Sequence, residues 1–174
     1  VNGTLFFTAN TTTEGNELWK SDGTTAGTLL VQDINPGSAS SSPTRITAGN
    51  ADVYFNATQG GTQYLMKTTG GGTGVTTLNN TVVSGGTFVS FFGFANKLFF
   101  MYDGYKPGIP STATGREPWV SDGTNAGTML VKDINTVISA NNANPASYAS
   151  AGNNVYFAAT NSSNGVEFWK TDGT

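Results

Sequence analysis

An eight-residue segment that occurs three times constrains the fold of this chain more than any other feature. Glu17–Thr24, Glu117–Thr124 and Glu167–Thr174 all follow the pattern Glu-x-Trp-x-x-Asp-Gly-Thr. The first two copies begin 100 residues apart and the last two begin 50 residues apart, so a further copy is expected midway between the first two. Gln63–Gly70 is a worn version of the segment at that place. This recurrence predicts a tandem array with a period near 50 residues.

Short strand-like runs, separated by turn residues, fill each unit of the array. In the order of the chain they are Thr4–Thr8, Glu17–Lys20, Leu29–Val31, Arg45–Thr47, Val53–Phe55, Val75–Leu78, Leu98–Phe100, Met129–Val131 and Val155–Phe157. The pair Asp22-Gly23 predicts a tight hairpin in which both residues have a positive φ. Four antiparallel strands in a unit of about 40–50 residues are typical of a β-propeller blade.

We therefore expect an all-β, propeller-type array of four-stranded antiparallel blades with incomplete end units. The expected units cover residues 1–43, 44–87, 88–144 and 145–174. The chain begins at the first strong strand of one unit and stops after the Asp-Gly pair of another. From this we expect it to be an excerpt of a longer repeat protein.

A longer pattern identifies a family resemblance. The string Glu-Leu-Trp-x-x-Asp-Gly-Thr-x-x-Gly-Thr-x-x-Val-x-Asp-Ile is matched at Glu17–Ile34 and, with Pro118 in place of Leu, at Glu117–Ile134. The chain thus resembles the bacterial ELWxxDGT repeat family of large exported or surface proteins, over essentially its whole length. The resemblance implies a repeat architecture and an extracellular or cell-surface location, and no settled activity. The worn unit lacks the Trp and the Asp, which argues against a role that needs every unit.

Composition narrows the classes of function. Charged residues make up 11% of the chain, against about 25% in an average soluble protein, and the eight basic residues are scattered. This argues against nucleic acid as a partner, since phosphate binding needs clustered Lys and Arg. No run of apolar residues is long enough to insert into a membrane. With neither Cys nor His, and no unique pair of acids, we expect no enzyme and no cofactor.

Asp22, Asp122 and Asp172 have two interpretations. An Asp-Gly-Thr segment offers carboxylate, carbonyl and hydroxyl oxygens, which are the ligands that Ca²⁺ prefers. The same Asp also hydrogen-bonds readily to its own backbone in a turn. We favour the turn, because calcium loops concentrate several carboxylates within a dozen residues and each of these loops has one.

Aromatic residues supply the candidates for ligand binding. Trp19, Trp119 and Trp169 could stack on sugars, but strand aromatics flanked by apolar residues more often form a core. The better candidate is the insert Tyr102–Gly108, which lengthens one loop and supplies Tyr102, Asp103, Tyr105 and Lys106 as ligand-binding side chains. The alternative for the insert is an inert surface loop.

Two functions follow from these features. The first is a non-enzymatic extracellular binding or adhesion module, with glycan as the leading class of ligand. The alternative is a structural subunit of an extracellular filament or ring, assembled head to tail by strand complementation between incomplete end blades. The expected partners are therefore a glycan or surface ligand, or further copies of the chain that associate through the terminal strands.

Overall fold

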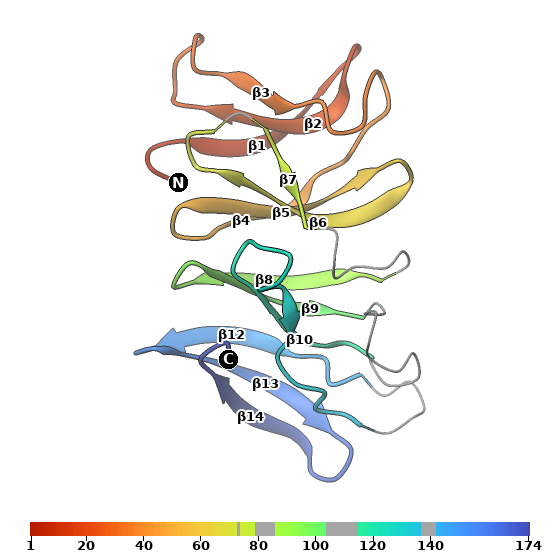
Figure 1. Ribbon diagram of the computed structural model, residues 1–174, viewed down its shortest axis with the longest axis vertical. Coiled ribbons are helices and arrows are strands. Elements are labelled where there is room, and N and C mark those ends of the chain that lie inside the picture. Colours follow the sequence, from red (N-terminus) through yellow and green to blue (C-terminus); the bar gives the residue numbers. More distant parts are fainter. Residues whose placement is uncertain (73, 79–85, 104–114, 137–141) are drawn as a thin grey trace. The chain divides into compact units, whose positions relative to one another are not determined.

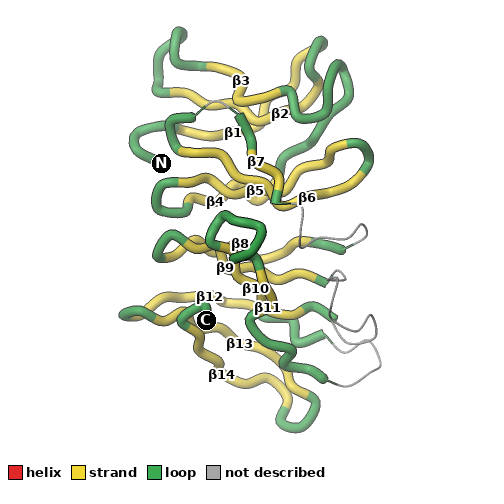
Figure 2. The backbone as a smooth tube through the Cα atoms, in the orientation of Figure 1, coloured by secondary structure: helices red, strands yellow, loops and turns green. Residues whose placement is uncertain are grey.

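The computed structural model describes residues 1–72, 74–78, 86–103, 115–136 and 142–174. These residues form fourteen strands and no helix, arranged in four antiparallel sheets (Figures 1 and 2). The expectation of an all-β fold built from antiparallel sheets is confirmed. The propeller arrangement of those sheets remains a prediction.

Within each sheet the strands lie side by side in the order of the chain. The first sheet contains β1 (Leu5–Thr11), β2 (Gly15–Ser21) and β3 (Leu29–Gln32). The second contains β4 (Thr44–Ala48), β5 (Asp52–Gln59), β6 (Thr62–Thr69) and β7 (Thr76–Thr77). The third contains β8 (Phe88–Phe94), β9 (Lys97–Tyr102), β10 (Glu117–Ser121) and β11 (Met129–Leu130). The fourth contains β12 (Ala146–Ala151), β13 (Asn154–Asn161) and β14 (Gly165–Thr171).

The chain divides into two compact units, each of which holds two sheets. The first unit is Val1–Asn79 and the second is Asn80–Thr174. In the first unit, Leu18, Val31 and Ile34 of the first sheet and its connector pack against Phe55, Ala57 and Met66 of the second sheet. In the second unit, side chains of the third sheet and its connector pack in the same way against Val155, Phe157 and Ala159 of β13. Each unit is therefore held together by one sheet packed face to face on the next.

Strand pairing defines which residues of the four sheets are equivalent. The motif tryptophan lies opposite an aromatic residue of the preceding strand, in the pairs Phe7–Trp19, Phe100–Trp119 and Phe157–Trp169. In the second sheet Met66 occupies the tryptophan position, since it lies opposite Phe55. The worn copy therefore begins at Tyr64, and the alignment that began it at Gln63 is wrong by one residue.

The first strand of three sheets carries an irregularity that the sequence pattern did not predict. The pairing shifts by one residue at Arg45 in β4, at Ser90 in β8 and at Ser147 in β12. These residues have φ values of 56°, 53° and 57°. Such a bulge bends a strand and increases its twist. Its recurrence at the same place in these three sheets makes it part of the repeat.

Candidate functional site

The Asp-Gly-Thr segment forms a loop held by its own side chains. Asp22 Oδ1 accepts hydrogen bonds from the backbone N–H of Thr24 at 2.9 Å and from the Thr24 hydroxyl at 2.7 Å. The backbone N–H of Gly27 donates to the Thr24 hydroxyl at 2.9 Å. Gly23 has a φ of 92°, whereas Asp22 does not have a positive φ. The tight two-residue hairpin predicted at Asp22-Gly23 is therefore wrong, since residues 22–28 together connect β2 to β3.

The second glycine of the motif lets the Asp side chain fold over the loop. A Cβ at Gly27 would lie 2.0 Å from Asp22 Oδ1, and a Cβ at Gly127 would lie 2.1 Å from the carboxylate of Asp122. Real Cβ contacts are not that short. The spacing Asp-Gly-Thr-x-x-Gly-Thr therefore encodes one compact loop, and hydrogen bonds repeat it closely at Asp122.

The three motif aspartates lie in separate loops, each bonded within its own turn. The Thr24 hydroxyl and backbone N–H lower the pKa of Asp22, and those of Thr174 lower the pKa of Asp172. Among the residues that the structure describes, no three His, Cys, Asp or Glu side chains gather as a metal-binding group. The turn interpretation accounts for the contacts of Asp22, Asp122 and Asp172.

The motif glutamate is a buried anchor that the sequence analysis missed. Glu17 accepts hydrogen bonds from the backbone N–H of Ile34 at 3.2 Å and of Ser41 at 2.8 Å, and also from the Ser41 hydroxyl. These bonds tie β2 to the connector that leads into the second sheet. The signal was present in the sequence, because both long copies of the motif place Glu 17 residues before Ile.

Glu117 makes the same anchor without a hydroxyl donor. It accepts a hydrogen bond from the backbone N–H of Ile134 at 2.9 Å. Ala143 takes the place of Ser41, since each residue accepts a backbone bond from the equivalent threonine of the next sheet. Ala143 has no hydroxyl to donate. Burial raises the pKa of Glu117 to about 7.

The structure describes two of the four residues predicted to bind a ligand. The Tyr102 ring is buried, with its centroid 4.7 Å from that of Phe88 and 5.6 Å from that of Trp119. It therefore presents no face to a sugar. Asp103 accepts hydrogen bonds from Arg116 Nε at 3.2 Å and from the backbone N–H of Thr87. Tyr105 and Lys106 lie outside the described residues, and the ligand site remains a prediction.

Two of the three motif tryptophans, Trp119 and Trp169, pack against aromatic residues of their own sheets. Trp119 is buried, and its ring stacks on Phe100 with centroids 6.3 Å apart. Trp169 is half-buried against Phe157, and its Nε1 donates to the Ala159 carbonyl at 3.1 Å. These contacts fit the core interpretation of the tryptophans.

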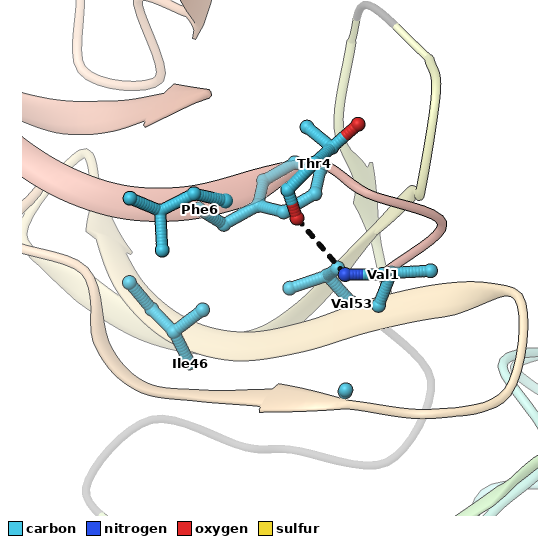
Figure 3. Close-up of a pocket in the computed structure, with 7 residues that line it drawn as sticks. Val1, Thr4, Phe6, Ile46 and Val53 are labelled. Atoms are coloured by element: carbon cyan, nitrogen blue, oxygen red, sulfur yellow. Dashed lines mark hydrogen bonds between the residues drawn. The ribbon is translucent and has the colours of Figure 1, made fainter. Parts of the chain in front are cut away.

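A small apolar pocket lies between β1 and the strands β4 and β5 in the first unit (Figure 3). Its volume is about 170 Å³, and its lining consists of Val1, Thr4, Leu5, Phe6, Ile46, Ala48 and Val53. Figure 3 shows Phe6 of β1 across the pocket from Ile46 of β4. The pocket lies beside β1, which is an edge strand of its sheet.

Two sheet faces at the ends of the chain expose apolar side chains that the repeat elsewhere buries. Phe168 on β14 is 76% exposed, although Leu18 and Leu65 at the same position are fully buried. Leu5 on β1 is 63% exposed, although Val53, Leu98 and Val155 at its position are at most 2% exposed. We name Tyr156, Val166 and Phe168 the outgoing face of the fourth sheet. We name Leu5, Phe7 and Trp19 the incoming face of the first sheet.

Comparison with known proteins adds no relative: no protein-family model matches the chain, and no curated protein is similar to it. The resemblance to the ELWxxDGT repeat family therefore remains a prediction based on the motif matches at Glu17–Ile34 and Glu117–Ile134. Within the described residues, no helix is long and apolar enough to cross a membrane. The comparisons that bear on function are those between the repeats of the chain itself.

Proposed function

We propose that the chain is a non-enzymatic building block of an extracellular bacterial assembly in which copies associate head to tail. The observation that carries this proposal is the exposure of Phe168 at a position that is buried in the other sheets. Large exposed apolar patches on soluble proteins usually mark a surface that binds another molecule. The low charge and the abundance of Thr, Asn and Gly support the extracellular location.

The outgoing face and the incoming face are equivalent to the two sides of a contact between sheets inside the chain. Within the first unit, Leu18 of the first sheet packs against Phe55 and Met66 of the second. Leu18 is equivalent to Phe168 of the outgoing face, while Phe55 and Met66 are equivalent to Phe7 and Trp19 of the incoming face. An outgoing face on one copy can therefore repeat, against the incoming face of a second copy, a contact that the chain already makes internally.

Packing of faces explains the association better than exchange of strands. The first and fourth sheets each have three strands, whereas the second and third have four. Among the strands that the structure describes, neither end sheet holds a spare strand with which to complete the other. The aromatic pair of Tyr156 and Phe168, with ring centroids 5.4 Å apart, instead offers a preformed apolar surface. Under this proposal the copies continue the blade-on-blade stacking of a propeller-type array.

The energy of such a contact comes from the whole face. Burial of one large apolar side chain contributes about 1.5–3 kcal/mol, whereas association costs about 4–15 kcal/mol of lost freedom. Phe168 and Leu5 alone would not hold two copies together. A contact between unlike faces of identical chains is heterologous, so it continues into a filament or closes into a ring.

The proposal is tested by size-exclusion chromatography with light scattering across a range of protein concentrations. The chain is expected to form assemblies whose mass grows with concentration, and Phe168→Asp and Leu5→Asp are each expected to abolish them. Leu29→Asp is the matched control, because Leu29 is also exposed but lies outside both faces. A wild-type chain that stays monomeric, or assemblies that survive Phe168→Asp, would contradict the proposal.

A second candidate is the glycan-binding module predicted at Tyr102–Lys106. It is supported by the partly exposed ion pair between Asp103 of the insert and Arg116, which offers both an acceptor and donors to sugar hydroxyls. A glycan array with the wild-type chain and Tyr105→Ala tests it. Binding that Tyr105→Ala removes is expected, and the absence of any bound glycan would exclude this candidate.

A further inference from the structure

We propose that the Glu117 anchor is a pH-sensitive switch, from which Ile134 opens locally more often once the Glu117 carboxyl is ionised. The equivalent Glu17 anchor holds Ile34 in place over the same range of pH. All residues of the Glu17 anchor lie in the first unit, and all those of the Glu117 anchor lie in the second. The inference therefore stands apart from the association of copies under the proposed function.

The two anchors bury their carboxyl in the same way and differ in one donor. Glu17 and Glu117 are both 0% exposed. Each accepts the backbone N–H of the isoleucine in its connector, at 3.2 Å in the first unit and at 2.9 Å in the second. The Ser41 hydroxyl also donates to Glu17, whereas Ala143 stands at the equivalent place beside Glu117. A hydrogen bond to a carboxylate favours its ionised form, so the second unit lacks one source of that support.

The groups that face Glu117 make its ionised form unfavourable. Burial raises the pKa of Glu117, and the charge of Asp133 in the connector raises it further. Burial also raises the pKa of Asp133 itself. On the neighbouring strand β9, Glu117 lies opposite Tyr102, whose phenol stays neutral because burial raises its pKa. An ionised Glu117 is therefore a second negative charge in a buried place.

Within the described ranges of the second unit, no cationic side chain forms an ion pair with Glu117. Arg116 precedes it on β10, but the Arg116 guanidinium pairs with Asp103 at 3.2 Å. Lys132 Nζ lies 5.5 Å from the centroid of the Trp169 ring. β13, which packs against the connector, has no Asp, Glu, Lys or Arg. The charged side chains of β9 and β14 are bonded elsewhere or exposed: Lys97, Glu167 and Lys170. Ionisation thus leaves a buried charge without a counter-ion, which is costly.

Two side-chain acceptors beside Ile134 favour the protonated form. Asp133 Oδ1 and Asn135 Oδ1 are buried, and neither has a hydrogen-bond partner among the described residues. These two residues flank Ile134, whose N–H donates to Glu117. A neutral Glu117 brings an O–H donor to these acceptors, whereas an ionised Glu117 brings further negative charge. Protonation therefore stabilises the closed anchor.

The pKa of Glu117 gives the direction of the switch and its range of pH. This pKa is about 7 in the closed anchor, against an ordinary value of 4.5 that the carboxyl recovers when the anchor opens to water. Between these two values the open state loses its proton while the closed state keeps it. Opening therefore becomes more favourable as the pH rises from 4.5 to about 7, and it levels off above that.

Amide hydrogen exchange, measured by NMR on the full chain, tests the switch because exchange of a buried amide reports its opening. Ile34 and Ile134 both lie in the sequence Asp-Ile-Asn, so their chemical exchange rates respond equally to pH. The ratio of the Ile134 rate to the Ile34 rate should rise at least about tenfold between about pH 5 and about pH 7.5. A ratio that stays constant would overturn the inference.

A second amide distinguishes local opening from unfolding of the whole unit. The Val131 N–H donates to the Pro118 carbonyl at 2.9 Å, within the third sheet. Val131 and its equivalent Val31 both follow a leucine, so their chemical rates are also matched. The ratio of these two rates should not change with pH. A rise at Val131 parallel to that at Ile134 would mean that the unit unfolds as a whole, and it would overturn the local switch.

Three variants assign the effect to the carboxyl and its missing donor. Glu117→Gln removes the titrating group and should make the ratio independent of pH, whereas a rise that persists in this variant would overturn the inference. Ala143→Ser supplies the hydroxyl and should reduce the rise. Ser41→Ala is the matched change in the first unit and should make exchange at Ile34 respond to pH. The wild-type ratio requires no variant, so the test holds even where a substitution prevents folding.

Discussion

The buried glutamates of the repeat motif differ in the donors that reach them. Glu17 receives the Ser41 hydroxyl in addition to two backbone N–H groups. Glu117 has Ala143 at the equivalent place, and burial raises its pKa to about 7. The two anchors therefore differ by the hydroxyl that Ser41 supplies and that Ala143 lacks.

Stability is expected to depend on pH through Glu117. The pKa of Glu117 is about 7 in the folded chain against an ordinary value of 4.5, so the folded state binds more protons between these values. The free energy of unfolding therefore falls as the pH rises through this window. Ala143→Ser restores the missing donor, so it should lower the pKa of Glu117 and raise the melting temperature at about pH 8.

Thermal unfolding at about pH 5 and about pH 8 measures this effect. Glu117→Gln is the control, because it removes the titrating group and should flatten this part of the pH dependence. An Ala143→Ser chain with the same pH slope as the wild type would show that the Glu117 carboxyl does not respond to the added hydroxyl.

At the scale of elements, the strands were predictable and the loops were not. Every strand-like run named from the sequence overlaps a strand, although some runs extend a residue beyond its ends. The runs were predictable because β-branched and aromatic residues between turn residues favour strands. The Asp22-Gly23 loop differs from the expected tight hairpin, since Asp22 bonds to Thr24 instead of adopting a positive φ. The Glu17 anchor depends on contacts with Ile34 and Ser41. No turn motif marks the bulge at Arg45 between β4 and β5.

Gly27→Ala should destabilise the loop between β2 and β3, because its Cβ would collide with the Asp22 carboxylate. The expected loss is about 0.5–3 kcal/mol, the usual range for a single disruptive substitution. Chemical denaturation of Gly27→Ala, Asp22→Ala and the double variant forms a double-mutant cycle. The double variant should lose less stability than the sum of the two single losses. Additive losses would mean that the Asp22 side chain does not need the space above Gly27.

At the scale of the whole molecule, the period of the sequence predicted repeated sheets but not which faces lie uncovered. The sequence gives no sign that Phe168 is exposed, since Leu18 occupies the same motif position. In the structure Leu18 is buried and Phe168 is not. Likewise, no sequence motif points to the pocket beside β1. The candidate ligand residues Tyr102 and Asp103 were chosen for their chemistry, and the burial of Tyr102 could not be read from that.

Mixing two variants tests head-to-tail association most directly. Phe168→Asp keeps the incoming face intact, and Leu5→Asp keeps the outgoing face intact. Each variant alone is expected to be monomeric by light scattering, whereas an equimolar mixture should form a dimer of twice the mass of one chain and nothing larger. Monomers in the mixture, or association of either variant by itself, would contradict the account.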